Sequence, residues 1–154
     1  MNAELASDFR LPSGPDSTLA LSELRGRPVV LVFYPADWSP VCSDQLSLYE
    51  TIRSEFDTYG AQLVGISVDG VWCHKAFAEN RGLSFPLLSD FEPKGAVSRQ
   101  YDVYREHDGC SGRALFLIDP TGVIEWREVV ELDENPGADG ILRALEGTTA
   151  SSGR

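Results

Sequence analysis

The sequence predicts an α/β fold with a central mixed β-sheet flanked by helices. Two continuous apolar runs, Val29 to Tyr34 and Gln62 to Val68, have the composition of strands that are buried on both faces. Apolar residues at helical spacing fill the segment between them, and a strand, a helix and a second strand in this order imply parallel strands joined by a right-handed crossover. A third buried run, Arg113 to Ile118, is followed by a turn and another strand, which adds an antiparallel hairpin.

The amino-terminal segment predicts a small hairpin around the Gly14-Pro15 turn, because apolar residues flank that turn on both sides. The helix between the first two buried strands is expected from about Ser43 to Tyr59, with a stop signal at Gly60. The remaining elements follow in chain order: a helix over 72–80, a short strand over 84–88, a helix over 94–101, a polar turn-like segment over 105–112, a strand over 123–130 and a last helix over 136–145. This order is the one found in the thioredoxin fold.

The length and composition fit a single domain. The chain has 154 residues, of which 42% are hydrophobic, and this is enough for one ordinary core. No internal repeat or linker is evident. We expect residues 1–146 to form the domain and residues 147–154 to be a disordered tail.

The charge balance argues against nucleic acid as a partner. The formal net charge is −11, whereas proteins that bind phosphate backbones carry an excess of Lys and Arg. No stretch reaches the roughly 18 apolar residues that a membrane-spanning helix requires, and residues 1–12 lack the basic start and apolar run of a secretion signal. The expected location is the cytoplasm, with no membrane partner.

The chain has three cysteines, Cys42, Cys73 and Cys110. An odd number without a secretion signal argues against a framework of structural disulfides and favours reduced thiols. A free cysteine is often only a small buried apolar residue, so its surroundings have to decide.

Cys42 has the surroundings of a nucleophile. It follows the first parallel strand at the point where a helix begins, and ligands of open parallel sheets bind beyond the carboxyl ends of the strands. Free N–H groups and the positive end of the helix dipole favour the thiolate form of a cysteine placed there. The hydroxyl of Ser39 lies three residues earlier, within reach of the sulfur or of a bound substrate, and Pro35 helps to shape and shield the pocket.

The pattern Pro35-x-x-x-Ser39-x-x-Cys42 after a buried strand resembles the active-site motif of the peroxiredoxin family, the AhpC/TSA-like redoxins. Similar stretches follow at 85–90 (FPLLSD), 95–101 (GAVSRQY) and 113–119 (RALFLID). The resemblance covers roughly residues 7–145 and is nearest to the bacterial PrxQ and AhpE subgroups. It implies a thiol-dependent antioxidant peroxidase without a cofactor that reduces hydrogen peroxide or organic hydroperoxides. It also implies a monomer or homodimer, reduced by thioredoxin, a glutaredoxin-like protein or a low-molecular-weight thiol.

The resemblance assigns Cys42 as the peroxide-attacking residue, Pro35 and Ser39 as pocket residues and Arg113 as the nearby cation. The topology supports Arg113 independently, because its strand is predicted to run antiparallel to the first two and therefore begins at the edge where Cys42 lies. A guanidinium there would stabilise the thiolate and the charge on the leaving oxygen.

Two positions depart from the family pattern. Ser39 stands where threonine is commoner, which keeps the hydroxyl but loses the methyl that restricts its rotation. Gln45 stands where glutamate is usual, and an amide can hydrogen-bond to an arginine without supplying a charge.

Asp37 would disfavour the thiolate form of Cys42 if it faced the site. Trp38 is expected to lie close enough to sense the site.

After attack, Cys42 would be a sulfenic acid that must condense with a thiol. Cys73 is the favoured partner, because it follows the neighbouring parallel strand, although a disulfide needs α-carbons within about 7 Å and hence local unwinding. Cys110 is the less favoured partner. Position 47 is serine, so the common PrxQ spacing is absent, and an external thiol is the alternative.

Two other function classes remain open from the residues alone. One is a thioredoxin-like disulfide oxidoreductase, although Ser39 replaces the attacking cysteine of a Cys-x-x-Cys motif. The other is a non-catalytic redoxin-like binding module. A zinc site is not expected, because the chain has only two histidines and no paired Cys-x-x-Cys.

Overall fold

The computed structural model describes the backbone of residues 4–152 and the side chains of residues 4–148. Its centre is a five-stranded sheet in the order β5-β4-β3-β8-β9. Strands β3 (Val29–Phe33), β4 (Gln62–Ser67) and β5 (Leu87–Ser89) are parallel to one another, whereas β8 (Arg113–Ile118) runs antiparallel to β3 and pairs with β9 (Ile124–Val130). The predicted mixed sheet is therefore confirmed.

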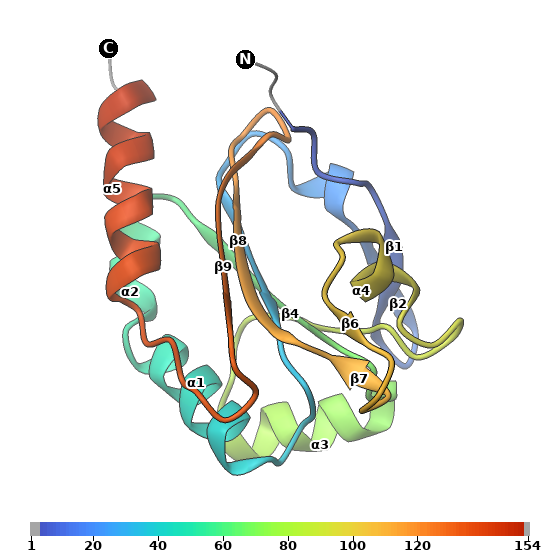
Figure 1. The fold of residues 1–154 in the computed structure, drawn as a ribbon. Helices are drawn as coiled ribbons and strands as arrows, with labels where there is room; N and C mark the ends of the chain where they lie inside the picture. The colour runs from blue at the N-terminus through green and yellow to red at the C-terminus, as the bar shows by residue number, and fades with distance from the viewer. Residues whose placement is uncertain (1–3, 153–154) are drawn as a thin grey trace.

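Two layers cover the sheet (Figure 1). The helices α1, α2, α3 and α5 pack on one face, and the amino-terminal hairpin, α4 and a short ribbon pack on the other. The helices are α1 (Pro40–Thr51), α2 (Arg53–Thr58), α3 (Val71–Arg81), α4 (Ala96–Gln100) and α5 (Asp139–Ser152). The smaller elements are β1 (Arg10–Gly14), β2 (Ser17–Ala20), the 3-10 helix η1 (Leu21–Leu24), β6 (Tyr104–Arg105) and β7 (Cys110–Ser111).

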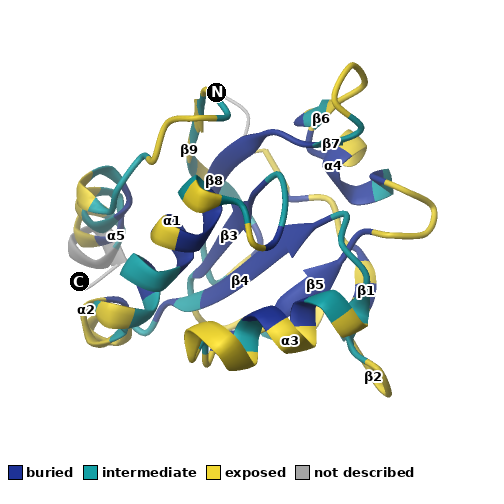
Figure 2. Cartoon of the chain, turned by 90° about the horizontal axis from the view of Figure 1, so that it is seen from below, coloured by how far each residue is buried: buried dark blue, intermediate teal, exposed yellow. Residues whose placement is uncertain are grey.

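The core consists of two apolar clusters, one on each face of the sheet. Because successive side chains of a strand point to opposite faces, β3 sends Leu31 and Phe33 into one cluster and Val30 and Val32 into the other. Figure 2 shows the central strands buried between the two layers, while exposed residues lie on the outer helix surfaces and loops. The cluster under the helices also contains Cys42, so the candidate nucleophile is part of the core.

The expected helix over 43–59 is wrong in its bounds. The structure has two helices there, α1 from Pro40 and α2 from Arg53. The earlier start follows from Ser39, which caps α1, and from Pro40, which tolerates the first helical position because its nitrogen needs no partner. The break lies at Ile52, whose ψ of 22° departs from helical geometry.

The last helix also differs from the prediction over 136–145. It begins at Asp139, because Gly137 has a φ of +67° and its N–H donates to the Asn135 side chain in a turn. It extends to Ser152, with Ile141 and Leu145 buried in the core. The predicted disordered tail is therefore wrong for residues 147–152, and residues 153–154 lie outside the described part.

Smaller shifts occur elsewhere. The strand expected over 84–88 is Leu87–Ser89, the helix expected over 94–101 is Ala96–Gln100, and the turn-like segment over 105–112 contains part of the β6-β7 ribbon. In the second case Gly95 has a φ of +71°, which delays the helix start. The helix expected over 72–80 and the amino-terminal hairpin are confirmed within a residue or two.

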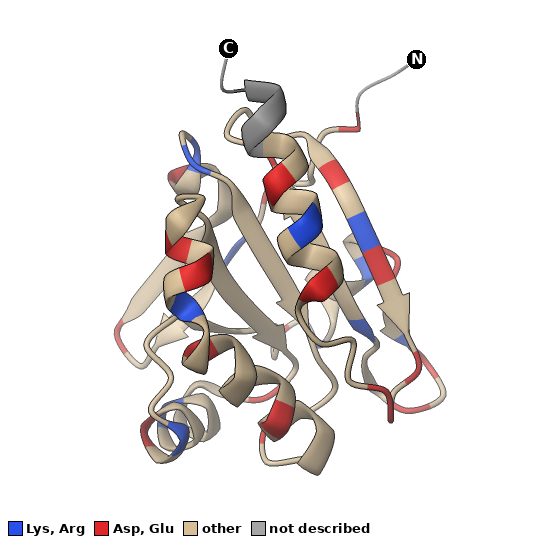
Figure 3. Cartoon of the chain, turned by 90° about the vertical axis from the view of Figure 1, so that its left-hand side faces the viewer, with Lys and Arg blue, Asp and Glu red and all other residues tan. Residues whose placement is uncertain are grey.

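No helix within residues 4–152 is long and apolar enough to cross a membrane. Figure 3 shows acidic residues spread over the helical side of the molecule and fewer basic ones, in agreement with the net charge of −11.

Candidate active site

The loop after β3 places Cys42 in the first turn of α1. The Ser39 hydroxyl oxygen accepts a hydrogen bond from the Cys42 backbone N–H at 3.3 Å, which makes Ser39 the N-cap. Cys42 has no exposed surface. Its sulfur therefore lies at the positive end of the helix dipole and beyond the carboxyl end of a central strand, as the sequence predicts.

Arg113 contacts the Cys42 sulfur directly. The pairing of Phe33 with Ala114 brings the start of β8 to the end of β3, and the Arg113 Nη1 donates to Cys42 Sγ at 3.3 Å. The side chain is only 1% exposed. The predicted approach of Arg113 to Cys42 is confirmed.

Apart from the Cys42 sulfur, only neutral groups accept hydrogen bonds from this guanidinium. Arg113 Nη1 also donates to Gln45 Oε1 at 2.9 Å, and its Nε and Nη2 donate to the Leu132 carbonyl at 3.1 and 2.5 Å. None of the ion pairs found among the described residues includes Arg113. A buried cation without a carboxylate makes the sulfur the natural place for a compensating negative charge.

Gln45 is held in turn by Tyr49 on the same helix. The Gln45 Nε2 donates to the Tyr49 hydroxyl at 3.2 Å, and that hydroxyl donates to the Gly137 carbonyl at 2.8 Å. Burial raises the pKa of Tyr49 to about 12, so it stays a neutral hydroxyl at physiological pH.

The Asp37 carboxylate is held by Tyr34 and by His74 on α3. The carboxylate accepts from the Tyr34 hydroxyl at 2.6 Å and lies 2.7 Å from His74 Nδ1. The other ring nitrogen of His74 lies 3.0 Å from the Leu88 carbonyl. The sequence could not orient Asp37, and the structure directs its charge toward α3.

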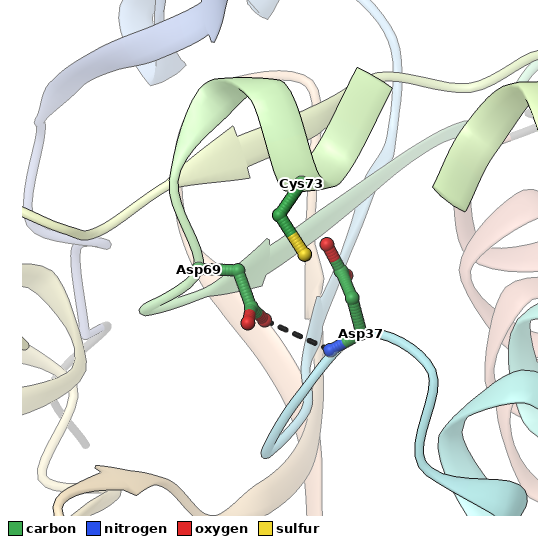
Figure 4. Close-up of side chains that lie close together, drawn as sticks. All are labelled: Asp37, Asp69 and Cys73. Carbon is green, nitrogen blue, oxygen red and sulfur yellow. Dashed lines mark hydrogen bonds between the residues drawn. The ribbon is translucent and has the colours of Figure 1, made fainter. Parts of the chain in front are cut away.

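Cys73 lies beside that charge. Its sulfur and the carboxylates of Asp37 and Asp69 lie within 4.8 Å of one another (Figure 4). Burial and the neighbouring charges of Asp37 and Asp69 raise the pKa of Cys73 to about 11, which holds it as a thiol.

These three groups have ligand atoms of the kind that bind metals, but the carboxylates already have protein partners. Asp69 Oδ2 accepts from the Asp37 backbone N–H at 2.8 Å and from the Ser67 hydroxyl at 2.5 Å. Asp37 is bonded to Tyr34 and His74. The cluster is therefore a hydrogen-bonded anchor between the loop after β3 and the start of α3.

The other predicted site residues lie around the same loop. Pro35 is half-buried between β3 and α1. Trp38 adopts a φ of +72°, which is unusual for a residue with a side chain, and its ring packs edge-on against Phe77 at 5.2 Å. Cys110 is half-buried on β7, in the ribbon that leads into Arg113. Its pKa is raised by burial and then by the charge of Asp108.

The sequence reasoning missed Tyr49, His74 and the Leu132 carbonyl as parts of these networks. For Tyr49 a signal existed, because Cys42, Gln45 and Tyr49 recur at helical spacing and so share one face of α1. No side-chain pattern could identify a backbone carbonyl.

Three comparisons with known proteins, by family profile, by sequence and by structure, show what this chain is similar to. A family profile described as "AhpC/TSA family" matches residues 3–127. The Mycobacterium tuberculosis protein named alkyl hydroperoxide reductase E is 35% identical over 130 residues, covering 84% of this chain and 85% of that protein. The selenocysteine-containing peroxiredoxin PrxU of Peptoclostridium acidaminophilum is 35% identical over 151 residues, covering 92% of this chain and 73% of that protein.

A solved structure is similar over nearly the whole chain. The crystal structure of peroxidoxin BcpB from Mycobacterium tuberculosis superposes with a TM-score of 0.84 at 33% identity, covering 94% of this chain and 96% of that one. The predicted thioredoxin-like fold is thereby confirmed.

Proposed function

This chain belongs to the AhpC/TSA family of peroxiredoxins and is a thiol-dependent peroxidase, and we propose that Cys42 is the residue that attacks the peroxide. The observation that carries this assignment is the 3.3 Å contact between Cys42 Sγ and a buried guanidinium that has no carboxylate partner among the side chains of residues 4–148. Among the three cysteines, Cys42 alone combines a helix N-terminus with a contacting cation, whereas Cys73 lies beside two carboxylates.

The proposed reaction needs only the sulfur and a source of protons. The Cys42 thiolate attacks the terminal oxygen of the hydroperoxide, so that an S–O bond forms while the O–O bond breaks. Sulfur is oxidised to the sulfenic acid, and the peroxide is reduced to an alcohol, or to water from hydrogen peroxide, once the departing oxygen takes up a proton. Arg113 stabilises the thiolate before attack and the charge on the leaving oxygen during it.

The loop before α1 leads directly to the sulfur. Because Cys42 has no exposed surface, the structure around it has to open before a peroxide reaches the sulfur. Pro35 and Ser39 bound the loop at either end, which is consistent with a role for both in shaping the pocket. The Ser39 hydroxyl accepts from the Cys42 N–H, so its hydrogen stays available to a bound peroxide oxygen.

The second half-reaction consumes a thiol. A thiol attacks the sulfenic sulfur, water leaves and a disulfide forms, which a further thiol then reduces. An internal disulfide with Cys73 would require the start of α1 to open, and the raised pKa of Cys73 makes it a slow nucleophile at neutral pH. We therefore propose an external thiol, from thioredoxin, a glutaredoxin-like protein or a small molecule, as the reductant, with Cys73 and then Cys110 as the internal alternatives.

The two rival classes lose support. A disulfide oxidoreductase would need a second thiol where Ser39 caps the helix. A non-catalytic binding module does not fit a chain whose relatives are named as an alkyl hydroperoxide reductase and a peroxiredoxin.

The test is the intact mass of the protein after one equivalent of hydrogen peroxide, with dimedone present to trap sulfenic acid. Cys42→Ser is expected to abolish rapid peroxide consumption, and Cys73→Ser and Cys110→Ser serve as matched controls that retain it. A dimedone adduct on the parent protein supports the external thiol. A loss of two hydrogens that Cys73→Ser or Cys110→Ser converts into an adduct identifies that residue as the internal partner. Unchanged consumption by Cys42→Ser would contradict the assignment.

A further inference from the structure

The side chain of Arg113 belongs to a hydrogen-bond chain whose donors and acceptors can be assigned from one end to the other. The Gly137 carbonyl can only accept, so the Tyr49 hydroxyl donates its single hydrogen there. The Tyr49 oxygen then accepts from the Gln45 Nε2, which fixes the amide so that its Oε1 faces Arg113. The chain ends at the Cys42 sulfur, which accepts from the same Arg113 Nη1.

The hydrogen-bond chain matters because the two ends of the Gln45 amide differ: its oxygen accepts hydrogen bonds and its NH2 group donates them. If the Gln45 amide rotated by half a turn, its NH2 group would face the guanidinium, and two donors would oppose each other. The Tyr49 hydroxyl prevents this, because it is committed to Gly137 and can only accept from Gln45. All three side chains are buried, so water does not substitute readily for a lost partner.

The hydrogen-bond chain from Gly137 to Cys42 contains only neutral groups apart from Arg113 and the sulfur. A carboxylate at position 45 would form a charge-assisted pair with the guanidinium and place a second negative charge beside Cys42. The amide holds the guanidinium in the same place without compensating its charge.

We propose that Tyr49, acting through Gln45, is a positioning residue that fixes the Arg113 guanidinium in a neutral frame and thereby leaves its charge to the Cys42 sulfur. The proposal rests on the proposed function of Cys42, but it concerns the thiolate before any peroxide is bound. It adds to that function a link between the active site and the turn at Gly137, which precedes α5.

The test measures how readily Cys42 becomes a thiolate, without peroxide. All proteins carry Cys73→Ser and Cys110→Ser, so that iodoacetamide reports on one sulfur, and the rate of alkylation is followed by intact mass as a function of pH. The midpoint of this pH profile is the readout, because a change that only loosens the pocket alters the rate at every pH without moving the midpoint.

Tyr49→Phe is expected to raise the midpoint by about one pH unit, which lowers the thiolate fraction about tenfold at pH values below it. Gln45→Glu is expected to raise it as well, because it places a negative charge beside the sulfur. There are two matched controls. Tyr59→Phe changes a tyrosine that is not part of the hydrogen-bond chain, and Gln100→Glu adds the same charge on the exposed surface of α4. Both controls should keep the parent midpoint.

The other titratable groups near these elements stay constant across the series. They include Asp44 and Glu50 on α1, Asp37 in the loop before it, Glu131 beside Leu132, and Glu128 on β9, whose charge acts on Tyr49, while Cys110 on β7 is replaced in every protein. A difference between Tyr49→Phe and the parent is therefore due to the hydroxyl.

An unchanged or lowered midpoint in Tyr49→Phe overturns the proposal. If that variant fails to fold, as judged by circular dichroism, Gln45→Glu decides in its place, and an unchanged midpoint there overturns the proposal as well. Peroxide consumption by the same proteins separates the two claims. A shifted midpoint in a protein whose Cys42 does not consume peroxide would leave the positioning role standing and refute the proposed function.

Discussion

Replacing Arg113 by methionine removes the cation that contacts Cys42 and keeps a side chain of similar length. Hydrogen bonds that involve a charged group contribute about 1.5–3 kcal/mol each. Cys42 Sγ accepts one such bond from Arg113, at 3.3 Å. Since about 1.4 kcal/mol corresponds to tenfold in rate, we expect Arg113→Met to consume peroxide about 10- to 150-fold more slowly than the parent.

The assay is a single turnover with hydrogen peroxide at neutral pH. Arg113→Lys should fall between the parent and Arg113→Met, because it keeps the charge but lacks the planar fork that holds the Leu132 carbonyl. Arg81→Met removes an exposed arginine at the end of α3 and should react at the parent rate.

Stability has to be measured beside the rate. The methionine leaves the Leu132 carbonyl and the Gln45 amide oxygen without their donor, but it also removes a buried charge. Urea unfolding shows whether the variants are folded under the assay conditions. A folded Arg113→Met that reacts within about twofold of the parent would refute the electrostatic role of Arg113.

Three further predictions concern the rest of the structure. The thiol form of Cys73 persists until the pH approaches its raised pKa of about 11, so alkylation of Cys73 in Cys42→Ser should be slow at neutral pH. Adding Asp37→Asn removes a neighbouring negative charge and should accelerate this alkylation. Equal rates with and without Asp37→Asn would count against an effect of Asp37 on Cys73. His74→Leu leaves the buried Asp37 carboxylate without the hydrogen bond to the imidazole and should lower the free energy of unfolding in urea by about 1–3 kcal/mol, and a loss below about 0.5 kcal/mol would contradict the structure here. Gly95→Ala combines a φ of +71° with a β-carbon only 2.3 Å from the Tyr104 ring, so we expect a loss of roughly 2–4 kcal/mol in thermal unfolding, which an unchanged melting temperature would disprove.

The sequence predicted the central sheet and the meeting of Cys42 with Arg113 because both follow from local pattern and topology. A buried strand can be recognised from its residues. A strand that runs antiparallel to its neighbour begins at the edge of the sheet where that neighbour ends. The contact at 3.3 Å is the direct consequence.

The bounds of the helices were harder to predict, because they depend on single backbone angles and on tertiary packing. Ile52 interrupts an otherwise continuous apolar pattern with one non-helical ψ angle. The last residues of the sequence are mostly polar or small, which does not predict a helix. The helix α5 nevertheless extends to Ser152, because Ile141 and Leu145 pack its earlier turns against the core.

The orientation of Asp37 could not be predicted, because it depends on partners far away in the sequence. His74 lies 37 positions later, and only the packing of α3 against the sheet brings its ring to the carboxylate. The favoured pairing of Cys42 with Cys73 was inferred from their shared edge of the sheet, which says nothing of the charges around each sulfur.

The loop between β3 and α1 gives these two cysteines opposite electrostatic surroundings on that edge. Asp37 bonds to Tyr34 and His74, so the negative charge of the loop is held on the α3 side, where Cys73 stays protonated. Trp38 then adopts the left-handed conformation, and Ser39 caps the helix that carries Cys42, which contacts Arg113. The anchored Asp37 therefore keeps its hydrogen bonds to Tyr34 and His74, while the sulfur of Cys42 accepts from Arg113.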